Sequence, residues 1–236
     1  MSDEAGAAGP EPPAPTTELS PSVRAQLLAT EHWSLLASRS TTQGEVLTRI
    51  SMFLTFTSAS LLSVALVGNA TQFSDDFRAF ALTILSIDVV VGLLTQIRVL
   101  NVGMEDLMYV LAMNRLRAAY VELDPGMARY LMAGYHDDEA GSEQTYYFLG
   151  GRGSFSQVAG SSMMFIMTAN SALLALLIGS VLTVLQVPTP VSISVAVVAA
   201  LAFFAVTMVR GGRRYYAVWK INQPISPTPA LARPSN

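Results

Sequence analysis

Long uncharged stretches dominate the pattern of apolar and polar positions along the chain. No Asp, Glu, Lys, Arg or His occurs between Arg152 and Arg210, or between Arg49 and Asp75. As one helix, the first stretch would measure roughly 85 Å, nearly three times the hydrocarbon thickness of a bilayer, about 30 Å. We therefore expect it to cross a membrane twice and to reverse at the Pro-Thr-Pro sequence of residues 188–190, because proline breaks a helix.

The same pattern predicts four transmembrane helices, at about residues 50–67, 79–97, 162–186 and 191–209. The polar segment between the first two is too short for a domain, so these two helices should form a hairpin, and the last two should form another. The expected fold class is all-α: an integral membrane protein with four transmembrane helices in two hairpins, plus cytoplasmic helices.

The remaining segments complete the expected organisation. Thr42 and Glu45 stand at the spacing of a capping box, which predicts a helix start just before the first span. A separate helix is expected at 22–38 and another at 104–123, into which the second span could continue. The expected parts are a disordered tail at 1–21, a cytoplasmic helix at 22–48, a transmembrane hairpin at 49–98, a cytoplasmic helix and loop at 99–160, a second hairpin at 161–210, and a basic and aromatic anchor with a proline-rich tail at 211–236.

Composition supports a membrane location and excludes several chemistries. Charged residues make up 13% of the 236 residues, about half the usual share of a soluble domain, which is about 25%. There is no Cys, so disulfides, Cys-based metal sites and catalytic thiols are excluded. With both termini cytoplasmic, every Lys and Arg except Arg78 lies on the cytoplasmic side, as the positive-inside rule requires. The expected location is the cell (plasma) membrane.

Basic and aromatic residues follow the fourth span and indicate a membrane interface. Tyr and Trp sit at the level of the lipid headgroups, and cations beyond them can meet anionic headgroups. The lipid bilayer is therefore an expected partner. The expected anchor residues are Arg210, Arg213, Arg214, Tyr215, Tyr216, Trp219 and Lys220.

Asp88 is the most informative single residue. It lies midway between Arg78 and Arg98 in the second span, about 15 Å from either and close to the bilayer centre. An ionised Asp there costs at least about 2.5–3.5 kcal/mol, so without a cation the protonated form is favoured. Two interpretations stay open. Asp88 is either a proton or cation site, or a protonated packing residue that hydrogen-bonds to another span.

Other polar and small residues in the spans suggest contacts between helices. Asn170 in the third span is the best polar partner for Asp88, and its simplest role is to hydrogen-bond between helices. Thr95 and Gln96 lie on or beside the face of Asp88. Small residues also recur at spacings near four, which favours close helix packing, although a hydrophilic pore lining is the alternative. These packing residues are Ser171, Ala175, Gly179, Thr183, Ser192, Ala196 and Ala200.

Familiar catalytic and binding motifs are not found. The acidic run at 136–139 lacks the spacing of a metal site and is expected to be a solvated loop. The sequence at 150–154 lacks the Lys and the preceding strand of a phosphate-binding loop, and it is expected to be a flexible linker. We expect no catalytic residues, no metal, no cofactor and no nucleic-acid partner.

Three segments resemble parts of a protein family: TEHWSLL at 30–36, MNRLRAAY at 113–120 and HDDE at 136–139. They are similar to segments of uncharacterised bacterial multi-pass membrane proteins of similar length, and the resemblance covers roughly residues 25–215. It implies a bacterial, four-span membrane protein, and it implies no activity and no functional residue.

Two functional hypotheses follow. In the first, the chain is not an enzyme but a homo-oligomer that forms a channel-like or proton- or ion-coupled assembly. Four helices enclose little volume, so a pore would arise from symmetry, with Asp88 facing the axis. In the second, the chain is a membrane-embedded scaffold whose cytoplasmic helices bind a partner protein. The many apolar residues of 104–123 favour this hypothesis.

Overall fold

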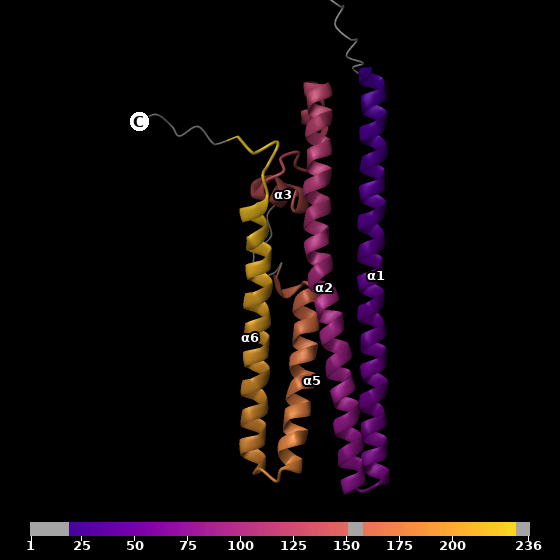
Figure 1. Cartoon of the computed structure of the whole chain (residues 1–236), viewed down its shortest axis with the longest axis vertical. Helices are drawn as coiled ribbons and strands as arrows, with labels where there is room; N and C mark the ends of the chain where they lie inside the picture. Colours follow the sequence, from indigo (N-terminus) through magenta and orange to yellow (C-terminus); the bar gives the residue numbers. More distant parts are fainter. Residues whose placement is uncertain (1–18, 151–157, 230–236) are drawn as a thin grey trace, which may run out of the picture.

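The computed structural model describes residues 19–150 and 158–229, and this part of the chain is helical and contains no strand (Figure 1). The expected disordered tail lies mostly in residues 1–18, and most of the expected linker lies in 151–157, both outside the described residues. In chain order the helices are α1 (Pro21–Ala70), α2 (Asp75–Leu123), the 3-10 helix η1 (Pro125–Tyr130), α3 (Glu139–Tyr146), α5 (Ser162–Val184) and α6 (Thr189–Ile221).

Four of these helices, α1, α2, α5 and α6, are long and apolar enough to cross a membrane. Their apolar segments fall where the uncharged stretches of the sequence predict them. The 50 residues of α1 and the 49 of α2 each measure about 75 Å, more than twice the hydrocarbon thickness. Both helices must therefore continue well beyond any bilayer that they cross.

The predicted helix start near Thr42 is wrong, because α1 is one continuous helix from Pro21. Ser20 caps it by accepting a hydrogen bond from the backbone N–H of Val23, and Pro21 stands in the first turn. The hydroxyl of Thr41 donates to the carbonyl oxygen of Ala37 inside the helix. A capping-box spacing starts a helix only where the preceding chain is not helical, and no residue at 38–42 interrupts this one. In the same way, α2 continues from the second span into 104–123 without a break.

The four long helices form a row in the order α1, α2, α5, α6 (Figure 1). Neighbouring helices pack along their lengths, so α2 has a helix on both sides while α1 lies at the edge. The short turn from α1 to α2 and the one from α5 to α6 lie at the same end of the molecule's long axis (Figure 1). We call the opposite end the polar end, which comprises residues 21–49, 98–150 and 210–229.

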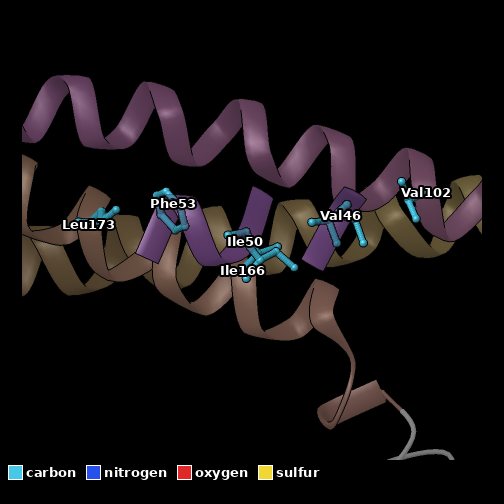
Figure 2. Close-up of a cluster of buried hydrophobic side chains, with 7 residues drawn as sticks. Val46, Ile50, Phe53, Val102, Ile166 and Leu173 are labelled. Atoms are coloured by element: carbon cyan, nitrogen blue, oxygen red, sulfur yellow. The ribbon is translucent and has the colours of Figure 1, made fainter. Parts of the chain in front are cut away.

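A cluster of buried apolar side chains joins three of the helices near the middle of the molecule (Figure 2). Side chains from α1 and α2 meet there with two from α5, the shortest of the four helices. This packing fixes the depth of α5 against the much longer α2. The cluster contains Val46, Ile50, Phe53, Val99, Val102, Ile166 and Leu173.

Candidate functional site

Asp88 lies on a face of α2 that is buried along its length. Asp88 itself has no exposed surface. The residues that helical spacing places around it are buried as well: Ala81, Leu85, Gly92, Thr95 and Gln96. An aspartate that is fully enclosed by apolar helices is costly in its ionised form unless a cation accompanies it.

Neither carboxyl oxygen of Asp88 has a hydrogen-bond partner among the described residues. The hydroxyl groups of Thr57 and Ser60 on α1 lie beside the carboxyl and are its nearest donors, and Thr57 Oγ1 has no other partner among the described residues. The site is therefore a cluster of oxygen atoms between α1 and α2. Such a group can hold a proton or coordinate a small cation, since oxygen atoms are the ligands that hard cations prefer.

The expected pair of Asn170 with Asp88 does not form. Asn170 Nδ2 instead donates to the carbonyl oxygen of Gly92 at 2.8 Å and to Gln96 Oε1 at 2.7 Å. Both acceptors lie on α2 beyond Asp88, whereas the carboxyl lies beside α1. Asn170 thus ties α5 to α2, in keeping with its simpler predicted role, and its Oδ1 is buried without a partner.

Gly92 is what allows α5 to approach α2 at this point. A Cβ atom at residue 92 would collide with Asn170 Oδ1 and would lie 3.1 Å from the ring of Phe53. Thr95, one helical turn further on, makes no link to another helix, because its hydroxyl donates to the carbonyl oxygen of Val91 in α2 itself.

The small residues of α5 and α6 pack between helices, and several of them also line an open crevice. Ser171, Ser192 and Ala196 are buried, and a Cβ at Gly179 would lie 3.9 Å from that of Ala196, an ordinary contact. Ala200 is half-buried. The crevice, about 750 Å³, lies between α2, α5 and α6 near the turns, and its lining includes Ala81, Ala175, Gly179, Thr183, Ser192 and Ala196.

At the polar end, Asp106 of α2 is held by three other side chains. Arg39 of α1 donates from Nε to Oδ1 at 2.6 Å and from Nη2 to Oδ2 at 3.1 Å. Gln43 and Tyr146 donate to the same carboxylate at 3.0 and 2.8 Å. Burial raises the pKa of Asp106, but these hydrogen bonds outweigh burial and leave the pKa below its ordinary value.

This cluster fastens α1, α2 and α3 together, and sequence reasoning missed it. A helix that begins at residue 104 would place Asp106 in its first turn, where the helix dipole favours acids, but Asp106 lies within the continuous α2. Burial and the neighbouring Asp106 raise the pKa of Tyr146, so its phenol stays protonated and remains a donor. No local sequence pattern links residues so far apart in the chain.

The acidic run at 136–139 is not the solvated loop that we expect from the sequence. Asp137 has no exposed surface. Its carboxylate accepts hydrogen bonds from the backbone N–H groups of Ile225 and Ser226, at 2.9 and 2.8 Å, and from Arg115 Nε at 2.6 Å. Burial raises the pKa of Asp137, but these three donors together bring it below its ordinary value.

Around Asp137, the chain after α6 is fixed to the loop before α3. Asn222 Nδ2 donates to the carbonyl oxygen of Asp137, and the N–H of Thr228 donates to Asp138. These contacts fix residues 222–228, the first part of the expected proline-rich tail, against the loop before α3. Residues 230–236 lie outside the described part.

The expected anchor occupies the last three turns of α6. Its Arg and Lys side chains are exposed, and Tyr215 packs edge-on against both Tyr216 and Trp219. The basic residues are Arg210, Arg213, Arg214 and Lys220. In the described ranges, no three His, Cys, Asp or Glu side chains converge as metal ligands would.

Comparison with known proteins gives no relative. No family model, no curated protein and no solved structure matches this chain.

Proposed function

We propose that this chain crosses the cell membrane four times as two helical hairpins, with both termini in the cytoplasm. The row of four apolar helices supports this topology, and so does the charge distribution. Arg78 is at the end with the two turns, and every other Lys and Arg among the described residues lies at the polar end. The resemblance to uncharacterised bacterial multi-pass proteins belongs to the same proposal.

Within that topology, the protein acts as a homo-oligomeric assembly in which each subunit binds and releases a proton or a small cation at Asp88. One observation carries this proposal: the Asp88 carboxyl is fully buried, and both of its oxygen atoms lack partners. A packing residue would satisfy those oxygens with donors on a neighbouring helix. An intramembrane carboxyl that has only the Thr57 and Ser60 hydroxyls of α1 beside it, and no cationic side chain among the described residues, is a candidate for ion or proton transfer.

The position of Asp88 favours a site inside each subunit. Its side chain lies between α1 and α2 and has no surface that another subunit could contact. This supports binding and release of an ion within one subunit, coupled to movement of α1 against α2. It argues against an open pore that Asp88 lines on a symmetry axis.

The experiment is a flux measurement in liposomes that carry the purified protein. Proton and monovalent-cation flux is compared between wild type, Asp88→Asn and the control Asp76→Asn, which removes an exposed carboxylate from the same helix. The proposal predicts flux from wild type and Asp76→Asn and none from Asp88→Asn. Equal flux from all three removes Asp88 from the mechanism, and no flux from the wild type under any ion or proton gradient contradicts the function itself.

A second candidate function, a membrane-embedded scaffold, is favoured by a groove at the polar end. The groove, about 400 Å³, has apolar side chains of α1 and α2 along its floor and polar residues at its sides, and Met108 within it is 57% exposed. Its lining residues are Glu31, Leu35, Met108, Leu111, Ala112, Arg115, Leu116 and Asn222. A photo-crosslinking residue at Met108 should then capture one protein in cells, while the same probe at exposed Glu122 captures none. Identical patterns from the two positions would contradict this candidate.

A further inference from the structure

The outward-facing surface of α1 is left unpartnered in a single chain. As one of the two edge helices of the row, α1 packs along its length only against α2 among the long helices. In its most apolar segment 17% of the residues are buried, compared with 33% in α2. The exposed surface of α1 therefore needs another occupant, at least where that surface is apolar.

One strip on this surface runs straight along α1. At 100° per residue, six exposed residues fall within an arc of about 60°. We call these residues the outer strip: Leu36, Ser40, Leu47, Ser51, Leu54 and Ser58. All are small or aliphatic and none is charged. Because α1 is continuous, the strip passes from the polar end into the proposed first span without interruption.

Lipid cannot cover the whole strip. Leu36 is 41% exposed and lies about 20 Å along the helix from the start of the proposed span, beyond the headgroup layer. Trp33, at the edge of the same arc, is 71% exposed and lies further out still. Exposed apolar side chains on a helix in water mark a protein contact when they continue an apolar surface. The occupant must therefore be a protein that follows α1 from the membrane into the cytoplasm.

The positions of the charged residues on α1 indicate which protein covers the outer strip. The charged residues of α1 are Arg24, Glu31, Arg39, Glu45 and Arg49, and all of them lie outside the arc of the strip. Two copies in one membrane have the same orientation, so a symmetric contact places each residue near its own equivalent. A charged strip would then bring like charges together. Because the outer strip carries no charge, two copies can meet on it without this repulsion, and its serines allow the two helices to approach closely.

We propose that the outer strip of α1 is the surface on which a second copy of this chain docks, with the two α1 helices parallel around a two-fold axis along the membrane normal. Leu36 and Leu47 of each copy then leave water, and Ser51 and Ser58 lie at the point of closest approach within the bilayer. The proposal rests on the proposed topology, because only co-oriented copies align their strips, but it does not depend on the role of Asp88.

The absence of Cys from the chain makes the test direct. Single variants Leu36→Cys, Ser40→Cys, Leu47→Cys and Ser51→Cys are oxidised in isolated membranes, and dimers are detected on non-reducing gels and by mass. Ser38→Cys is the matched control for Ser40→Cys, since both serines are exposed at the polar end but lie on opposite sides of the helix. A disulfide needs Cα atoms within about 7 Å.

The proposal predicts that cysteines on the strip give a disulfide-linked species of twice the chain mass and that Ser38→Cys does not. Equal dimer from Ser38→Cys and Ser40→Cys would indicate random collision and overturn the proposal. The proposal would also be overturned if every strip variant stayed monomeric. A disulfide-linked adduct with a protein of another mass would overturn it as well. Ion flux that survives or fails in the Asp88→Asn variant does not alter this result, so the two proposals can fail separately.

Discussion

Asn170 of α5 and Gly92 of α2 are joined by a hydrogen bond from Nδ2 to the backbone carbonyl oxygen, 2.8 Å long. The bond forms because residue 92 has no side chain to hold the two helices apart. It lies one helical turn from Asp88, so this contact sets the position of α5 beside the buried carboxyl.

Replacing Gly92 with Ala should destabilise the protein. The added methyl group collides with Asn170 Oδ1, which forces the helices apart and weakens the hydrogen bond, at a total cost of about 2–4 kcal/mol. Gly179→Ala is the matched control, because a Cβ there makes an ordinary contact with Ala196; its stability should be unchanged or up to about 1 kcal/mol greater. Thermal unfolding in lipid nanodiscs measures both, and equal midpoints would contradict the assigned role of Gly92.

Breaking the cluster at Asp106 should loosen the polar end. Asp106→Ala leaves Arg39 half-buried without its counter-ion and removes the acceptor of Tyr146, which we expect to cost about 2–4 kcal/mol. Glu31→Ala is the control, because Glu31 is an exposed carboxylate of α1 outside this network. Hydrogen exchange at 21–45 should rise sharply in the first variant. If the exchange rates of both variants match the wild type, the cluster does not stabilise this end.

The hydrogen-bonded carboxylates of Asp106 and Asp137 predict a loss of stability in acid. The folded-state pKa values of Asp106 and Asp137 both lie below the ordinary value of about 3.9. Each ionised carboxylate therefore contributes its full stability above the unfolded-state pKa, and the contribution is lost as the pH falls through the lower folded-state pKa. Unfolding midpoints should be level from pH 7 to about pH 5 and should fall below pH 4. In Asp106→Asn this acid decline should be smaller, and a decline of unchanged size would contradict the assignment.

Asp137 should control the segment that follows α6. Asp137→Ala removes the acceptor of two backbone N–H groups and of Arg115, so residues 222–228 should detach while the four long helices remain folded. Limited proteolysis should then cut this segment in the variant and not in the wild type. Glu143→Ala, which removes an exposed acid of α3, is the control. Equal protection in Asp137→Ala would show that other contacts hold the segment.

The sequence predicts the spans and the buried face of α2, because both depend on local periodicity. An uncharged stretch predicted α5 within two residues of its observed end, and helical spacing placed Thr95 and Gln96 on or beside the face of Asp88. The sequence does not predict the hydrogen-bond partners of the polar residues. Arg39 meets Asp106, and Asp137 meets Ile225, only after distant segments pack. Charge alone made the acidic run look solvated, since no local signal shows that backbone N–H groups surround it.

Infrared difference spectroscopy in lipid tests the central claim, that Asp88 exchanges a proton or a cation, most directly. Spectra of wild type and Asp88→Asn are recorded between pH 5 and pH 10 (roughly the range in which shifted carboxyls titrate), with and without sodium. If Asp88 exchanges a proton or a cation, the wild type shows the carbonyl band of a protonated carboxyl that changes with pH or sodium, and Asp88→Asn lacks this band. Identical difference spectra for the two proteins would mean that Asp88 never changes its protonation or its ligand, and would contradict the account.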